Sequence, residues 1–180
     1  RMAIIQNGSS LFTGDAGSGP SEIRRYIIEN DWLDAIVQLP NDSFYNTGIA
    51  TYVWIITKDK PVGHLGSVQL IDASKCYVQR RKPIGNKRVD ITKEARDLII
   101  RAYGAYRNDT FEAEDESGHK LVVKTKVMST MSLGYNKITV ESPITDEEGK
   151  PILKKGKMQP DTSKRDTENV PLDEDMDTYF

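Results

Sequence analysis

Two short apolar runs with a long polar loop between them constrain the fold of this chain more than any other feature. The runs cover Leu33 to Leu39 and Thr51 to Ile56, and both have the length and composition of strands. The loop between them carries Phe44 and Tyr45 side by side, where a core cannot easily accept both rings. We therefore predict two strands joined by a polar loop with aromatic side chains at its tip.

The segment before these runs predicts a β–α–β unit. Met2 to Gln6 is a short apolar run that we expect to form a buried strand. A glycine-rich loop follows at Gly14 to Gly19, and apolar residues at helical spacing then predict a helix over Ser21 to Glu29. The strand Leu33 to Leu39 completes the unit, so its crossover should be right-handed and its two strands parallel.

The segment after the second apolar run is less regular. Ser67 to Asp72 has the pattern of another strand, whereas residues 79–88 are basic and have little strand character. Thr92 has the position of an N-cap for a helix over about 92–106, whose apolar residues keep helical spacing throughout. This helix is the best defined in the sequence.

The last third of the chain carries few apolar residues. We expect residues 109–119 to form an acidic loop and residues 120–124 and 135–141 to form two strands, with pairing between those two strands left open. From about residue 143 large apolar side chains are nearly absent. Such a polar tail cannot bury enough surface to fold alone, so it should lie on another surface or stay mobile.

Composition excludes several classes of protein. The formal net charge is −2, so any contact with nucleic acid must come from a local patch. The single cysteine, Cys76, excludes an internal disulfide framework and fits a cytoplasmic protein. Because Cys76 has no paired histidine, we expect its thiol to be unreactive. No run approaches the roughly 20 apolar residues that span a bilayer, so we expect no membrane contact. His64 and His119 have no metal ligands at suitable spacing, and we expect no metal site.

Two stretches are candidates for contact with nucleic acid. In the polar loop, Phe44 and Tyr45 offer stacking faces, and Asn46 and Thr47 offer polar groups, a combination that suits a flat ligand such as a nucleobase. A long hairpin loop whose Phe packs down and whose Tyr lies on the surface fits the same residues. The second stretch is a basic run that suits DNA phosphates or a solvated surface loop equally well. It consists of Arg80, Arg81, Lys82, Lys87 and Arg88.

The glycine-rich loop invites a third interpretation, a nucleotide-binding loop. The spacing G-x-G-x-x-G is not met, because the residue three positions after Gly19 is Glu22. A loop that leads from strand to helix is the simpler interpretation, and a nicotinamide- or nucleotide-dependent enzyme is disfavoured.

The string AIVQLPNDSFYNTGIATYVWIITK, with RMAIIQNGSSLFTGDAGSGPSEIRRYIIENDW upstream of it, closely resembles the modification subunit of type I restriction–modification systems. That family consists of S-adenosylmethionine-dependent adenine-N6 DNA methyltransferases. The likeness covers Arg1 to about Ala73 and resumes in GYNKITVESP, from Gly134 to Pro143.

The resemblance implies an α/β fold, the C-terminal part of a Rossmann-like methyltransferase sheet that is mostly parallel with an antiparallel last strand. It assigns residues 1–75 to the catalytic domain and residues 76–180 to a mixed helical and β extension. The family's Gly-rich cofactor motif and its Asn-Pro-Pro-Phe/Tyr catalytic motif lie upstream of such a segment and are absent here. We therefore expect a piece of a longer protein that has no catalytic residue and is inactive alone.

The resemblance also implies roles and partners. In related methyltransferases an aromatic residue between the last two strands faces the extruded adenine. The resemblance gives this role to Phe44 or Tyr45, with a slight preference for Phe44. Asn46 and Thr47 are then available for polar contacts with the base. The implied partners of the intact, S-adenosylmethionine-dependent enzyme are DNA, a specificity subunit, a second modification subunit and a restriction subunit. The extension from Cys76 onward is a candidate for subunit contact. The alternative function is a non-catalytic module for DNA clamping or subunit assembly.

Overall fold

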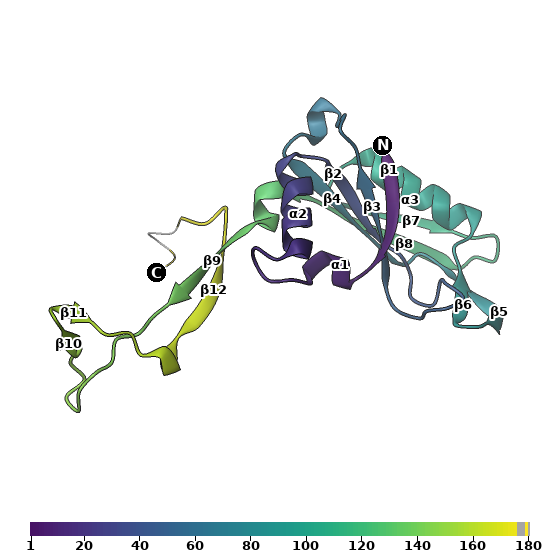
Figure 1. The fold of residues 1–180 in the computed structure, drawn as a ribbon. Helices are drawn as coiled ribbons and strands as arrows, with labels where there is room; N and C mark the ends of the chain where they lie inside the picture. Colours follow the sequence, from purple (N-terminus) through teal and green to yellow (C-terminus); the bar gives the residue numbers. More distant parts are fainter. Residues whose placement is uncertain (176–178, 180) are drawn as a thin grey trace. The chain divides into compact units, whose positions relative to one another are not determined.

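The computed structural model describes residues 1–175 and 179, and the chain divides into two compact units, Arg1–Thr130 and Met131–Phe180. The first unit contains a six-stranded sheet in the order β1-β3-β2-β4-β8-β7 (Figure 1). Its elements are β1 (Met2–Asn7), α1 (Ser9–Phe12), α2 (Gly19–Glu29), β2 (Leu33–Gln38), β3 (Thr51–Ile56), η1 (Val62–His64), β4 (Ser67–Lys75), β5 (Val78–Ile84), β6 (Lys87–Asp90), α3 (Lys93–Ala105), β7 (Asp109–Glu114) and β8 (Lys120–Ser129).

The sheet is mixed. In the described sheet β2 and β4 pair in parallel, whereas the other neighbouring strands pair antiparallel. The α/β class is confirmed, but the expectation of a mostly parallel sheet is wrong for these strands. The reason is connectivity, because β2–β3 and β7–β8 are joined by loops that return the chain beside the preceding strand, which makes each of these pairs antiparallel.

The expected β–α–β unit is present in modified form. Both β1 and β2 pair antiparallel with β3, so they run in the same direction with β3 between them. Strand β1 pairs only with β3 among the described strands, and its Met2 and Ile5 are exposed. The expectation that this first strand is buried is therefore wrong, because β1 lies at the edge of the sheet.

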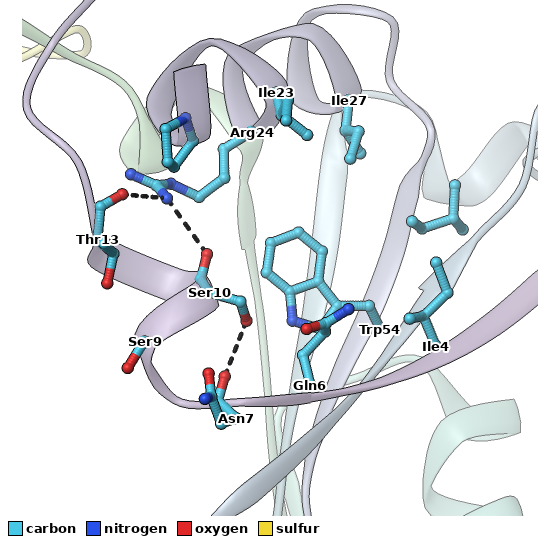
Figure 2. A pocket seen from close by; sticks show the side chains of 12 residues that line it. Ile4, Gln6, Asn7, Ser9, Ser10, Thr13, Ile23, Arg24, Ile27 and Trp54 are labelled. Carbon is cyan, nitrogen blue, oxygen red and sulfur yellow. Dashed lines mark hydrogen bonds between the residues drawn. The ribbon is translucent and has the colours of Figure 1, made fainter. Parts of the chain in front are cut away.

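Alternate side chains of the central strands face two different helices. Val53 and Ile55 of β3 pack against the main core, which α3 covers with Leu98 and Ala102. Trp54 of the same strand points to the other face, beside α2 (Figure 2), and Ile56 lines the same groove. This period of two is that of a strand covered on both faces.

Helix α3 is the element that sequence predicts best. It begins at Lys93, and the hydroxyl oxygen of its N-cap Thr92 accepts a hydrogen bond from the Ala95 N–H at 3.3 Å. Ala95, Leu98 and Ala102 are buried on one side of the helix, as the apolar spacing predicts.

Two segments that we expected to be loops are strands. Residues 78–90 form the β5–β6 hairpin, which turns at Gly85 and Asn86, two residue types that favour tight hairpin turns. Residues 109–114 form β7, in which the buried Phe111 alternates with acidic side chains. In β7 the acidic Glu112 and Glu114 are exposed and alternate with the less exposed Phe111 and Ala113, so their charge concealed the alternation. In β5 no such alternation exists, because Arg80 is half-buried and Ile84 is exposed, and the basic composition itself concealed the strand.

The second unit is built mainly from short strands. After η2 (Thr130–Leu133), which begins at the last residue of the first unit, its elements are β9 (Tyr135–Val140), β10 (Leu153–Lys154), β11 (Lys157–Met158), η3 (Thr162–Lys164) and β12 (Asp166–Pro171). Strand β9 pairs with β12 and not with β8. The two strands expected at residues 120–124 and 135–141, whose pairing the sequence left open, are therefore not partners. Strands β10 and β11 form a second small pair, so part of the polar tail has regular structure.

The domain boundary expected after residue 75 lies within the first unit, because the sheet continues through β8 and β7. The assignment of residues 1–75 to a catalytic domain concerns a longer protein and stays a prediction. Within the described residues, no helix has the length and apolar character needed to cross a membrane.

The packing of α3 makes a testable prediction about stability. Leu98 is 2% exposed, whereas Ile100 on the same helix is 65% exposed. Replacing Leu98 by Ala should lower the free energy of unfolding by about 2–5 kcal/mol, since it removes buried methyl groups and leaves a cavity. Ile100→Ala is the control and should change it by less than about 0.5 kcal/mol. Urea titrations of both variants check this, and equal losses would contradict the assigned orientation of α3.

Candidate nucleic-acid interface

Two segments with functional signals lie beyond the carboxyl ends of the parallel strands β2 and β4. Residues 39–50, named here the aromatic loop, follow β2, and the β5–β6 hairpin follows β4. Because neighbouring parallel strands end at the same edge of a sheet, both segments begin at that edge. In open α/β sheets this is the edge at which ligands bind.

The aromatic loop ends in a tight turn. Phe44 and Thr47 form an isolated antiparallel bridge, so Tyr45 and Asn46 lie at its tip. Tyr45 is 61% exposed and Asn46 is also exposed, whereas Phe44 and Thr47 are half-buried. The Thr47 hydroxyl oxygen accepts a hydrogen bond from the Ile49 N–H at 3.3 Å. The four candidate residues for base binding thus divide into an exposed pair and a supporting pair.

The hairpin and the aromatic loop are in direct contact. The Asn86 N–H donates a hydrogen bond to the Tyr45 carbonyl at 2.9 Å, and the Arg88 N–H donates to the Asp42 carbonyl, also at 2.9 Å. The Lys87 ammonium lies over the Tyr45 ring, 5.2 Å from its centroid. The aromatic residues and the basic run, two separate candidates in the sequence, are therefore parts of one surface.

The cations of the basic run fall into two groups. Arg80 and Lys87 form ion pairs with Asp90 at 2.5 and 3.1 Å, and the hydrogen bond from Arg80 holds the pKa of Asp90 below its ordinary value. The other three cations are exposed and have no ion pair within residues 1–175 and 179. They are Arg81, Lys82 and Arg88. Three charges are thus free for an anionic ligand, and two maintain the hairpin.

A buried polar cluster lies at the amino ends of β2 and β4, and the sequence analysis did not identify it. The Asp34 carboxylate is completely buried, accepts a hydrogen bond from the Tyr103 hydroxyl and lies 2.9 Å from Nδ1 of His64. The His64 ring stacks on Tyr106 with centroids 3.4 Å apart, and the Tyr106 hydroxyl lies 3.0 Å from Oγ of Ser67. The signal that could have found it is an aspartate within the apolar run Leu33 to Leu39.

This cluster has a structural role. It joins η1 and the C-terminal end of α3 to the amino ends of β2 and β4. Burial, together with the hydrogen bond to Asp34, raises the pKa of Tyr103 to about 12, so this hydroxyl stays protonated and keeps donating at neutral pH. A buried carboxylate with satisfied partners of this kind fixes the position of a helix on a sheet.

The glycine-rich loop folds upon itself. Its Ser18 N–H donates to the Asp15 carbonyl at 2.9 Å, and a Cβ added at Gly14 would lie 2.4 Å from Oγ of Ser18. Arg24 of α2 donates to the carbonyls of Thr13 at 2.7 Å and Ser10 at 3.3 Å (Figure 2). The loop is thus held by a turn of its own and by Arg24, as expected of a loop that leads from strand to helix.

A groove of about 440 Å³ lies between β1, β3 and α2 (Figure 2). Its walls are mainly apolar, and include Ile4, Ile23 and Ile27. The indole N–H of Trp54, which is buried at the groove, has no hydrogen-bond partner among the described residues. One face of the sheet beside β1 is therefore only partly covered by α2.

The remaining candidate residues do not form a reactive site. Among the described residues, no cluster of three or more His, Cys, Asp or Glu side chains could hold a metal ion. Cys76 is completely buried, and its sulfur lies 3.5 Å from the Ala95 carbonyl. Burial raises the pKa of the Cys76 thiol to about 11, so it is protonated at neutral pH and is a poor nucleophile.

Comparison with known proteins gives consistent matches. The family model described as N-6 DNA methylase matches residues 1–148. The type I restriction enzyme MjaIX methylase subunit of Methanocaldococcus jannaschii is 34% identical over 113 residues, which are 63% of this chain and 18% of that protein. The MjaVIII methylase subunit of the same organism is 26% identical over 148 residues, 82% of this chain and 24% of that protein.

A solved structure is also similar. The type I restriction-modification system methyltransferase subunit from Streptococcus thermophilus matches with a TM-score of 0.56 and 26% identity, over 73% of this chain and 23% of that one. This chain therefore spans about a quarter or less of the length of the relatives it matches.

The environment of Cys76 makes a testable prediction. At pH 8 the thiol of the native chain should react with iodoacetamide more than about a hundredfold more slowly than in denaturant, where the pKa returns to roughly 8.5. Mass spectrometry of timed samples gives both rates. Similar rates in the two states would show that Cys76 is accessible and would contradict its position beneath α3.

Proposed function

The chain belongs to the N-6 DNA methylase family, as its resemblance to type I modification subunits predicts, and we propose a role for it within that family. It supplies the surface that faces the target base in an adenine-N6 DNA methyltransferase. The observation that carries the proposal is the contact between the aromatic loop and the β5–β6 hairpin. An exposed ring and three free cations share one edge of the sheet, and these are the groups that an extruded nucleotide and its phosphates require.

Base extrusion sets the energetic requirement. An enzyme that modifies a base within a duplex must rotate it out, at a cost of a few kcal/mol. Stacking on one aromatic ring returns about 1–3 kcal/mol by alanine substitution, so a single ring at the tip of the aromatic loop offsets a large part of the cost. Asn46 lies beside Tyr45 at that tip and is exposed, so its amide is available for a polar contact with the base.

The free cations supply the complementary contact. Arg81, Lys82 and Arg88 are exposed on the hairpin, and each phosphate that they neutralise releases counterions and adds affinity without reading sequence. The formal net charge of −2 gives the chain no general attraction for DNA. Binding of DNA would therefore depend on this local patch of positive charge beside the base site, because the net charge of the chain does not attract DNA.

We also propose that this chain is part of a Rossmann-like methyltransferase domain and that the complete subunit uses S-adenosylmethionine. The exposed outer edge of β1 and the apolar groove beside α2 are surfaces that further strands and helices of a Rossmann-like methyltransferase domain would cover. In the family that this chain resembles, the cofactor motif and the catalytic motif lie upstream of such a segment, so cofactor binding and the methyl-transfer step belong to parts of the complete subunit outside this chain. This chain by itself should therefore be inactive.

The proposed partners follow from the same family. They are DNA, a specificity subunit, a second modification subunit and a restriction subunit, in a cytoplasmic complex. The extension from Cys76 onward is the proposed subunit contact, and Leu153 and Met158 of its small β10–β11 pair are exposed apolar side chains that suit this role.

The role of the aromatic loop is tested in the complete subunit. Replacing Phe44 and Tyr45 together by Ala should lower methylation of cognate DNA by roughly ten- to a hundredfold, the loss expected for one stacking contact. Binding of S-adenosylmethionine, measured by calorimetry, should stay the same because the cofactor site lies elsewhere. Normal methylation kinetics in the double variant would refute the proposal and favour a clamping or assembly module.

The role of the free cations is tested by charge reversal. In the variant with Glu at positions 81, 82 and 88, the slope of log K for DNA against log salt should fall by about 0.9 for each phosphate that is no longer neutralised, with sequence preference retained. Lys58→Glu is the control, because Lys58 is an exposed cation beside Trp32 at the opposite edge of the sheet. A salt slope that does not change in the triple variant would count against phosphate binding by the hairpin.

A further inference from the structure

We propose that Tyr45, and not Phe44, is the ring that stacks on the extruded base, and that the β5–β6 hairpin is the device that positions it. The inference rests on the proposed function of the aromatic loop and assigns its parts. It makes Gly85 and Lys87 positioning residues, although neither has a recognisable motif in the sequence.

Exposure distinguishes the two rings. A stacking residue must offer one open face to the base, and Tyr45 is 61% exposed at the tip of the turn. Phe44 is half-buried and belongs to the bridge with Thr47 that closes the turn. Phe44 therefore supports the tip that presents Tyr45.

The hairpin turn fixes the backbone at Tyr45. Gly85 has a φ of +59°, and a Cβ at this position would lie 2.5 Å from the Tyr45 carbonyl oxygen. A residue with a side chain could not approach so closely, and the approach allows the Asn86 N–H to donate to that carbonyl at 2.9 Å. Glycine at position 85 is thus required by the contact as well as by the turn.

Lys87 acts on the ring of Tyr45. Its ammonium lies 5.2 Å from the ring centroid, and the ion pair with Asp90 at 3.1 Å keeps it there. Asp90 is itself held by Arg80. A cation over one face of the ring limits its rotation and leaves the opposite face for a base.

Arg88 links the loop to the free cations. Its backbone N–H donates to the Asp42 carbonyl in the aromatic loop, while its exposed side chain is one of the three free charges. A phosphate bound by the hairpin and a base stacked on Tyr45 therefore act on two segments that are joined by backbone hydrogen bonds. Phosphate contact beside the target nucleotide should order the ring that receives the base.

The positioning is tested on the chain itself by Gly85→Ala. The matched control is Gly118→Ala, because Gly118 also has a positive φ, +78°, but has no atom within 4 Å of an added Cβ. Amide hydrogen exchange followed by NMR should be at least about tenfold faster at Asn86 and Arg88 in Gly85→Ala, and unchanged there in the control.

The amides of α3 are the internal standard in this experiment, because global unfolding would accelerate them as well. If Gly85→Ala unfolds the chain, Lys87→Met serves instead, and it should shift the NMR signals of the Tyr45 ring. Protection of Asn86 that is unchanged in a folded Gly85→Ala chain would overturn the positioning role, as would unchanged ring signals in Lys87→Met.

The choice of ring is tested in the complete subunit with DNA that carries 2-aminopurine at the target adenine, whose fluorescence reports extrusion and stacking. Tyr45→Leu removes the aromatic face but keeps apolar bulk, and should reduce the stacking signal and methylation by about ten- to a hundredfold. Tyr45→Phe should recover most of this loss, and Phe44→Leu should lose much less.

The outcomes separate the two claims. If Phe44→Leu carries the loss and Tyr45→Leu does not, the aromatic loop still binds the base and only the assignment to Tyr45 fails. If neither variant changes the signal and the double Ala variant methylates normally, the proposed function fails, while the exchange experiment still decides whether the hairpin holds the loop.

Discussion

The parallel pairing of β2 with β4 is the constraint on which the candidate site depends. Residues 35–38 of β2 lie in register with residues 69–72 of β4, so both strands end at one edge of the sheet. The aromatic loop leaves the first strand and the basic hairpin follows the second. If β4 ran in the opposite direction, the hairpin would begin at the other edge and could not donate to the carbonyls of Asp42 and Tyr45.

The amino ends and the carboxyl ends of the parallel strands β2 and β4 have different roles. At the amino ends of β2 and β4, buried partners satisfy Asp34, Tyr103 and Tyr106 and fix α3 in place. At the carboxyl ends, the Tyr45 ring has Lys87 over one face but stays exposed, and Arg81, Lys82 and Arg88 are exposed with no ion pair among the described residues. This division follows a general tendency of α/β sheets, in which stability and ligand binding are assigned to opposite edges.

Sequence reasoning succeeded where a local rule determined the result and failed where distant segments met. The N-cap at Thr92 and the apolar spacing of α3 predicted that helix correctly, and the two apolar runs predicted β2 and β3. Acidic side chains that alternate with Phe111 concealed β7, and the basic composition of residues 78–90 concealed β5 and β6. The candidate residues around Tyr45 and Arg88 were identified, but their contact joins positions about 40 apart in the chain and depends on the order of the strands. No pattern within either stretch contains that information.

The most direct test of the account is a crystal structure of the complete subunit bound to DNA with its target adenine extruded. We expect the adenine to stack on the face of Tyr45 opposite Lys87, with the adjacent phosphates contacted by Arg81, Lys82 or Arg88. Because the two segments that carry these contacts are hydrogen-bonded to each other, base and phosphate should be bound together. An adenine held away from the aromatic loop, or a hairpin turned away from the DNA, would contradict the account.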